Sequence, residues 1–160
     1  MGFGLPAAIG AQVAHPDKLV IDISGEASIL MCIQEMSTAL QHKLPVKIFI
    51  INNQYMGMVR QWQELLHDKR YSHSYTDALP DFVKLAEAYG AKGIRVQKPN
   101  DLDKAINEMI EYDGPVIFDC VVEQNENVFP MIPSGKAHNE MLLGDETVKE
   151  EISDEGKVLV

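Results

Sequence analysis

The sequence predicts an α/β fold: a doubly wound, mainly parallel sheet with helices on both faces. Short apolar runs alternate with segments of helical periodicity, which is the pattern of βαβ units. The apolar runs are nearly continuous and rich in β-branched residues, as expected for strands covered on both faces. At 160 residues, the chain is long enough to bury the core of one domain.

Four strands and five helices follow from these patterns. The predicted strands cover residues 19–23, 46–51, 93–97 and 116–122, and the predicted helices cover residues 5–14, 28–42, 56–67, 80–89 and 101–112. Pro6 is tolerated in the first turn of a helix, and the His15–Pro16 step ends that helix. Gly90 stops the helix over 80–89, and Asn100 is the expected N-cap of the last helix.

The chain is expected to form one domain in two parts. Residues 1–125 would form an α/β domain that binds a diphosphate. Residues 126–160 would form a lid-like segment and an acidic tail of the same domain. Seven acidic residues and two lysines lie between residues 140 and 160, so about half of the net charge of −10 is concentrated there. A solvated terminus is the simplest interpretation of this charge.

Composition narrows the classes of partner and compartment. A net charge of −10 argues against nucleic acid and acidic membranes as partners. The apolar runs are all shorter than the ~20 residues that a transmembrane helix needs. Cys32 and Cys120 each lie inside an apolar run, which favours two buried thiols in a reducing compartment over a disulfide or metal site. The N-terminal residues lack the basic start of a signal peptide, so we expect a cytoplasmic protein.

Two short polar motifs lie where the first two predicted strands end. Gly25-Glu26-Ala27-Ser28 follows the first strand, and Asn52-Asn53 follows the second. A small-residue turn between strand and helix exposes backbone N–H groups that can bind an anion. A carboxylate in that turn and an amide on the neighbouring strand could hold a divalent metal against the anion. Alone, each motif is more typical of an ordinary turn, and it is the pair at this separation, each after a hydrophobic strand, that favours a binding site.

The spacing of these motifs resembles the thiamine diphosphate motif, usually Gly-Asp-Gly followed some two dozen residues later by Asn-Asn. Other segments resemble the large catalytic subunit of acetolactate (acetohydroxyacid) synthase, and the resemblance covers essentially the whole chain. These segments are residues 2–11, 44–47, 52–62 (NNQYMGMVRQW) and 129–140 (FPMIPSGKAHNE). The Gln61-Trp62 pair and the segment from Pro133 to Glu140 disfavour the further alternative of another thiamine-dependent decarboxylase or oxidase.

The resemblance implies a role for several residues by position. Glu26, Asn53 and the Tyr55 carbonyl would bind Mg²⁺. The diphosphate loop would be Gly25, Ala27 and Ser28, and the further cofactor-binding positions would be Met1, Gly57 and Met58. Met1 matches a methionine that supports the bent thiamine, and Met58 would lie beside the thiazolium ring.

Three further residues are implied to act around the active site. Trp62 would line the substrate entrance and help to select the second keto acid. Lys136 and His138 fall in the segment that resembles a lid. Helix packing is the alternative for Met58 and Trp62, and a solvated surface position is the alternative for Lys136 and His138. Glu35 is interpreted as an acid on a helix face rather than a catalytic base.

The implied reaction is decarboxylation of pyruvate and carboligation to a second 2-keto acid, in branched-chain amino acid biosynthesis. The glutamate that activates the cofactor in this family lies on a pyrimidine-binding domain from another subunit, outside this sequence. We therefore expect the chain to be the C-terminal third of such a subunit, inactive alone and prone to form a homo-oligomer. The alternative is a truncated or decayed relative that acts as a non-catalytic binding or structural domain.

Glu26 departs from the aspartate of the family motif. One extra methylene moves the carboxylate by about a bond length, while Mg²⁺ requires near-ideal octahedral geometry at ~2.0–2.1 Å. We expect weakened Mg²⁺ binding, with better tolerance of Ca²⁺ or Mn²⁺.

Overall fold

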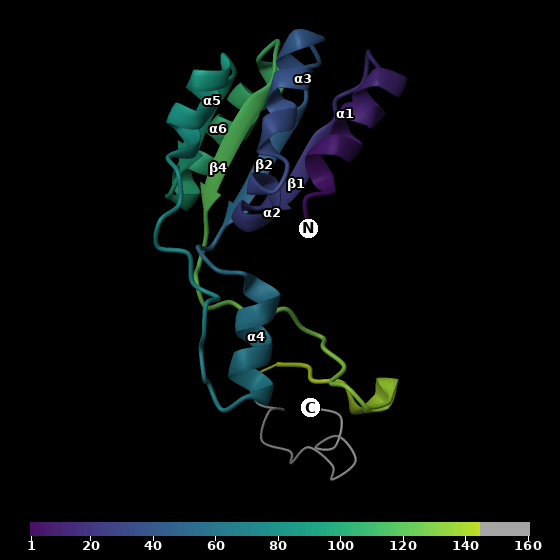
Figure 1. Ribbon diagram of the computed structural model, residues 1–160, viewed down its shortest axis with the longest axis vertical. Helices are drawn as coiled ribbons and strands as arrows, with labels where there is room; N and C mark the ends of the chain where they lie inside the picture. Colours follow the sequence, from purple (N-terminus) through teal and green to yellow (C-terminus); the bar gives the residue numbers. More distant parts are fainter. Residues whose placement is uncertain (145–160) are drawn as a thin grey trace. The chain divides into compact units, whose positions relative to one another are not determined.

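A computed structural model describes residues 1–144 of the chain (Figure 1). The chain divides into two compact units. The first, here called the sheet unit, comprises residues 1–56 and 75–125. The second, here called the α4 unit, comprises residues 57–74 and the chain from residue 126. The acidic tail over 145–160 lies outside the described residues, so its predicted solvation stays a prediction.

The sheet unit contains one sheet of four parallel strands, in the order β1-β2-β4-β3. Its strands are β1 (Ile21–Gly25), β2 (Lys47–Asn52), β3 (Lys92–Val96) and β4 (Val116–Val121). Its helices are α1 (Gly4–Ala14), α2 (Glu26–Leu30), α3 (Met36–Gln41), α5 (Phe82–Tyr89) and α6 (Leu102–Glu111). The predicted α/β fold with a parallel sheet is confirmed.

Two local predictions differ from the structure. The helix expected over 28–42 is divided into α2, a 3-10 turn at Ile33–Glu35, and α3, because Cys32 leaves the helical conformation with φ −135°. Periodicity did not reveal this break, since Ile29 and Met36 are buried in the same core on either side of it. The last helix follows Asp101 rather than Asn100, which lies inside a preceding 3-10 turn.

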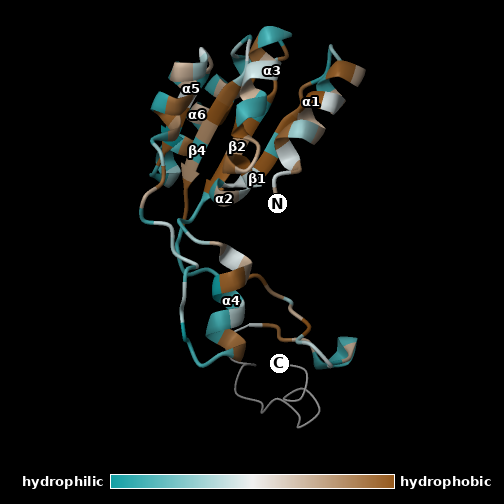
Figure 2. Cartoon of the chain, in the orientation of Figure 1, coloured by the Kyte–Doolittle hydropathy of each residue, from teal (hydrophilic) through white to brown (hydrophobic). Residues whose placement is uncertain are grey.

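The two faces of the sheet are covered by different helices, and the strands between them are strongly apolar (Figure 2). One core cluster contains buried residues of α1, α2, α3 and α5 packed on β2 and β4. The other contains α6 packed on β3 and β4, where Phe49 and Phe118 stack with ring centroids 4.6 Å apart. On this second face, Ile23 is 73% exposed and Ile21 and Ile51 are each 40% exposed. The α6 face is therefore apolar but incompletely covered over β1 and β2.

Two glycines allow close packing of helices on the face of the sheet that is covered by α1, α2, α3 and α5. A Cβ atom on Gly4 would collide with the Asp22 carboxylate, so α1 begins directly over β1. A Cβ on Gly93 would lie 2.7 Å from the Cα of Val83, so α5 packs tightly on β3. Glycine at these two positions lets each helix bring its first turn against the sheet.

The α4 unit is organised around α4 (Gly57–Leu66). Arg60 and Gln61 are each 1% exposed and bind the segment that follows the sheet unit. Arg60 donates hydrogen bonds to the Glu126 carbonyl and the Asn127 side chain, and Gln61 exchanges two hydrogen bonds with the backbone of Val128. No helix within residues 1–144 is long and apolar enough to cross a membrane.

Candidate functional site

The turn from β1 into α2 carries the first predicted motif. Gly25 is extended, with φ −79° and ψ 159°, and Glu26 begins α2 directly after the strand. Because β1 and β2 are parallel neighbours, with Gly25 opposite Ile51, this turn lies beside the end of β2. Glu26 is only 1% exposed, so the fold places a carboxylate inside the carboxyl edge of the sheet.

The loop after β2 carries the second motif. The Asn52 side chain accepts a hydrogen bond from the Gln54 N–H at 3.2 Å, and the Asn53 side chain accepts one from the Tyr55 N–H at 3.2 Å. Gln54 adopts a left-handed φ of 61°. The Thr76 N–H donates to the Gln54 carbonyl at 2.8 Å, which ties the loop to the following part of the sheet unit. The tight turn directs the Asn53 side chain along the loop.

The carboxylate of Glu26 interacts electrostatically with the loop after β2. Burial raises the pKa of Glu26 above its ordinary value, as does the charge of Asp119. Backbone N–H groups of Glu26, Asn53 and Tyr55 act in the opposite direction and lower this pKa. Within residues 1–144, the Oε1 atom of Glu26 has no hydrogen-bond partner. The structure thus brings together Glu26, Asn53 and Tyr55, the three residues predicted to bind the metal.

The N-terminal residues contact the same turn. The Gly2 N–H donates a hydrogen bond to the Ser28 hydroxyl at 3.0 Å. Gly2 has a φ of 75° and lies so close to Met31 and Cys32 that a Cβ there would be 3.2 Å from each. Met1 is therefore adjacent to the predicted diphosphate loop and is 73% exposed.

A second buried carboxylate, absent from the predicted site, lies on the neighbouring strand. Asp119 of β4 is 1% exposed and accepts hydrogen bonds from Asn52 at 2.9 Å and from Arg95 at 2.8 Å. Neither Asp119 nor Arg95 belongs to a recognised motif, so the sequence alone did not predict them as site residues. The available signal was an acid inside the otherwise apolar run Val116–Val121.

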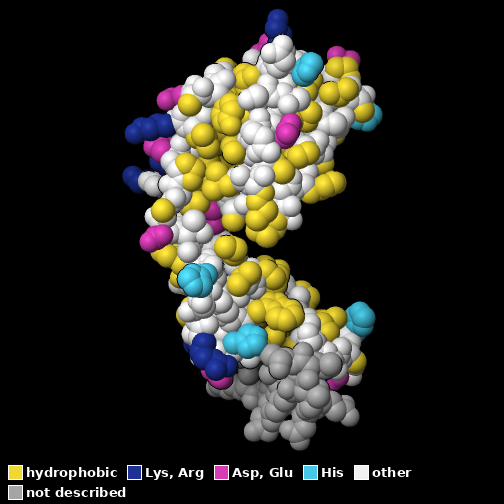
Figure 3. Space-filling view, in the orientation of Figure 1, with side chains coloured by type: hydrophobic (Ala, Val, Ile, Leu, Met, Phe, Trp, Pro, Cys, Tyr) yellow, Lys and Arg dark blue, Asp and Glu magenta, His cyan; other side chains and the backbone are white. Residues whose placement is uncertain are grey.

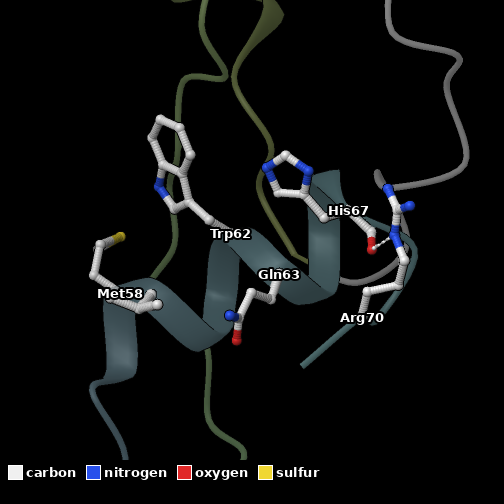
Figure 4. A pocket seen from close by; sticks show the side chains of 6 residues that line it. Met58, Trp62, Gln63, His67 and Arg70 are labelled. Carbon is white, nitrogen blue, oxygen red and sulfur yellow. Dashed lines mark hydrogen bonds between the residues drawn. The ribbon is translucent and has the colours of Figure 1, made fainter. Parts of the chain in front are cut away.

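The remaining predicted residues lie in the α4 unit. Met58 and Trp62 are on α4, 53% and 39% exposed, and apolar side chains gather on one face of this unit (Figure 3). With Val59, Gln63, His67 and Arg70 they line an open groove of about 550 Å³ (Figure 4). Arg70 Nε donates to the His67 carbonyl at 3.1 Å. The roles of Met58 beside the thiazolium ring and of Trp62 at the substrate entrance stay predictions.

Gly57 and Lys136 do not line this groove. Gly57 begins α4. The Lys136 ammonium pairs with Glu140 at 2.9 Å, within a segment closed by hydrogen bonds between Met131 and Leu142. The lid role of this segment stays a prediction, as does the division of the chain at residue 125.

Comparison with known proteins places these motifs in a family. Residues 1–120 match the family model "Thiamine pyrophosphate enzyme, C-terminal TPP binding domain". The chain belongs to this family. The resemblance to the acetolactate synthase large subunit is also supported, because curated proteins of that name match most of the chain at about half identity.

Three comparisons illustrate the extent of similarity. The acetolactate synthase large subunit of Porphyra purpurea is 51% identical over 143 residues, which cover 89% of this chain and 24% of the relative. The acetolactate synthase isozyme 3 large subunit of Escherichia coli is 47% identical over 146 residues, covering 89% and 25%. The thiamine diphosphate-dependent 4-hydroxybenzoylformate decarboxylase of Rhodococcus jostii superposes with a TM-score of 0.70 at 36% identity, covering 79% and 24%. The chain spans about a quarter of the length of these proteins.

The residues present fit a divalent cation. Glu26 Oε1 is buried and has no partner within residues 1–144. The side-chain carbonyl of Asn53 accepts a hydrogen bond from the Tyr55 N–H, and an amide oxygen carries two lone pairs. Residues 1–144 contain no cluster of three or more His, Cys, Asp or Glu suited to a metal. The predicted ligand set does not require one, because it combines a single carboxylate with amide and backbone oxygens, which suit Mg²⁺ and Ca²⁺.

Proposed function

We propose that the chain is the diphosphate- and metal-binding module of a thiamine diphosphate-dependent acetolactate synthase. Such an enzyme decarboxylates pyruvate and joins the remaining two-carbon unit to a second 2-keto acid, in branched-chain amino acid biosynthesis. The observation that carries the proposal is the buried Glu26 carboxylate, which faces the Asn53–Tyr55 loop with one oxygen unpartnered within residues 1–144. Identity near 50% with acetolactate synthases over 89% of the chain supports this choice of enzyme.

Within this module, each residue has a distinct role. Glu26, the Asn53 amide oxygen and the Tyr55 carbonyl would hold the cation. The turn at Gly25–Ser28 would hold the diphosphate through backbone N–H groups, since small residues there let the backbone approach closely. Thiamine diphosphate supplies the electron sink for decarboxylation when bound. The side chains and backbone groups of the protein would position the cofactor and supply charge around it.

Glu26 should shift the preference among cations. Its carboxylate extends about one bond further than that of an aspartate, and Mg²⁺ accepts only near-ideal octahedral geometry. Ca²⁺ accepts six to eight ligands at longer distances, so it tolerates the displaced oxygen better. We therefore propose weak Mg²⁺ binding and stronger binding of Ca²⁺ or Mn²⁺.

The module would need further polypeptide for activity. The glutamate that activates the cofactor belongs to a pyrimidine-binding domain, and this chain spans about a quarter of its relatives. Exposed Ile21, Ile23 and Ile51 on the α6 face support association with another polypeptide surface or a second copy. Analytical ultracentrifugation should show self-association at high concentration; a compact monomer would contradict it. Free Cys32 and Cys120 support a reducing compartment such as the cytoplasm.

Calorimetric titration with thiamine diphosphate tests the proposal. Titrations in Mg²⁺, Ca²⁺ and Mn²⁺ should show saturable, metal-dependent binding, with no pyruvate consumption by the chain alone. A folded protein that binds no cofactor with any of these metals would contradict the proposed function. That result would favour the alternative of a non-catalytic domain that keeps only the scaffold.

A further inference from the structure

Four polar side chains form a continuous hydrogen-bonded series across β3, β4 and β2. Arg95 of β3 donates to the Asp81 carboxylate at 3.0 Å and to Asp119 Oδ2 at 2.8 Å. Asn52 of β2 donates to Asp119 Oδ1 at 2.9 Å. Asp81 is the N-cap of α5, where it accepts from the Val83 and Lys84 N–H groups. Both oxygens of the buried Asp119 are therefore occupied.

This series ends at the loop that carries the predicted metal ligands. The Asn52 side chain has its amide nitrogen on Asp119 and its oxygen on the Gln54 N–H. A left-handed φ of 61° is unfavourable for a residue other than glycine, so Gln54 needs contacts that hold it. Asn53 and Tyr55, the proposed cation ligands, flank Gln54 directly. The Asn52 side chain thus connects Asp119 to the N–H of the residue between the two proposed ligands.

Arg95 also supplies the positive charge that faces the buried Asp119 carboxylate. Asp119 is close enough to Glu26 for the two carboxylates to repel each other. Without Arg95, Asp119 Oδ2 would lose its charged donor, and a buried carboxylate oxygen without a donor is strongly unfavourable. Asn52 would then be drawn toward the uncompensated carboxylate and away from Gln54.

We infer that Arg95 and Asp119 are positioning residues that hold the Asn52–Tyr55 loop in the conformation that binds the cation and the diphosphate. The expected effect on cofactor binding rests on the proposed function. The expected effect on the conformation of the loop does not. Arg95 lies on the edge strand β3, so its effect would reach the Asn52–Tyr55 loop of β2 through the one intervening strand, β4.

The first test measures the loop without any cofactor. Amide hydrogen exchange of the ¹⁵N-labelled chain is compared between the original protein and Arg95→Met. Protection of the Gln54 and Tyr55 amides should fall, while that of amides in β1 and α6 is retained. Lys92→Met is the matched control, because Lys92 lies on the same strand, is similarly exposed and pairs with Glu108 at 2.7 Å. Unchanged Gln54 and Tyr55 protection in Arg95→Met would overturn the inference.

The second test measures binding of thiamine diphosphate in Ca²⁺ by calorimetry. Arg95→Met should weaken binding by about 10- to 100-fold, the range found for residues that orient metal ligands. Lys92→Met should stay within about 2-fold, and Arg95→Lys should recover part of the loss because it restores the charge. Equal weakening by Arg95→Met and Lys92→Met would indicate a general structural effect and overturn the inference.

The two tests separate failure of the inference from failure of the proposed function. If the original chain does not bind the cofactor, the proposed function fails, and hydrogen exchange still decides whether Arg95 holds the loop. If Arg95→Met does not fold, Arg95→Lys and Asp119→Asn replace it, each expected to lower Gln54 protection selectively. Full protection of Gln54 in both variants would overturn the inference.

Discussion

Glu26 and Asp119 are two carboxylates with the same burial and opposite surroundings. Each is 1% exposed, and both lie toward the carboxyl end of the parallel sheet. Asp119 has a partner for each oxygen, Asn52 for one and Arg95 for the other. Glu26 has one oxygen without a partner within residues 1–144. A buried carboxylate is costly unless it is paired, so the difference separates a structural acid from an acid that fits a cation.

The largest expected effect is on stability, and it belongs to Asp119. Asp119→Ala should lower the free energy of unfolding by about 3 kcal/mol, because Arg95 and Asn52 lose their shared acceptor. Partial exposure of Arg95 keeps the loss at the low end of the range for buried pairs. Urea unfolding followed by circular dichroism measures it. Glu26→Gln, the matched variant, should change stability at pH 7 by less than about 0.5 kcal/mol or increase it. Equal destabilisation by Asp119→Ala and Glu26→Gln would contradict the distinction between a paired structural carboxylate and an unpaired one.

The next effect is on binding, and it belongs to Glu26. Glu26→Gln removes the only charged ligand of the proposed set and should weaken thiamine diphosphate binding in Ca²⁺ by roughly 30-fold, about 2 kcal/mol. Calorimetry on the folded variant gives the dissociation constant. Unchanged affinity of Glu26→Gln for thiamine diphosphate would contradict the role of Glu26 as a cation ligand.

A smaller effect should appear in the pH dependence of stability without added metal. The folded-state pKa of Glu26 lies above its ordinary value of 4.5, chiefly because of burial. The folded state then binds more protons than the unfolded state in the window above pH 4.5, so stability falls as pH rises through that window. Glu26→Gln should remove this part of the decline in urea unfolding measured across pH 4 to 8. Asp22, whose pKa burial also raises, contributes a decline of the same sign in both proteins. Identical pH profiles would contradict the assigned environment of Glu26.

The smallest expected effect is on metal preference, and it concerns the length of the Glu26 side chain compared with the aspartate that is usual in this motif. Glu26→Asp should increase the preference for Mg²⁺ over Ca²⁺ several-fold, because the shorter side chain withdraws the carboxylate to the distance that Mg²⁺ requires. Calorimetric titrations of thiamine diphosphate in each metal give the ratio. Asp119→Glu is the contrasting change, and it should lower stability rather than alter this ratio. An unchanged ratio in Glu26→Asp would show that side-chain length does not govern metal choice.

The site around Glu26 could be predicted from the sequence alone, whereas the pairing of Asp119 could not. Parallel strands end at one edge of a sheet, so motifs after two neighbouring strands must lie close together. That rule brought Glu26 and Asn53 into one site. Asp119 sits inside an apolar strand, and its partner Arg95 is 24 residues away on another strand. Pairing across strands depends on register, which periodicity does not specify.

The break between α2 and α3 was hidden for a related reason. Ile29 and Met36 keep the spacing of one buried helix face although Cys32 interrupts the helix. Core burial constrains which side chains face inward, and several backbone paths satisfy that requirement. The helix ends set by local chemistry were more predictable, as Gly90 shows with its left-handed φ of 90° at the end of α5.

The most direct measurement observes the two carboxylates themselves. ¹³C NMR of the chain with labelled Glu and Asp side chains would follow the Glu26 and Asp119 carboxyl resonances during addition of Ca²⁺ with thiamine diphosphate. Glu26→Gln and Asp119→Asn assign the two signals. We expect the Glu26 resonance to shift saturably with the ligands while that of Asp119 stays nearly constant. A stationary Glu26 signal under conditions where the cofactor binds would contradict the assignment of Glu26 as the cation ligand.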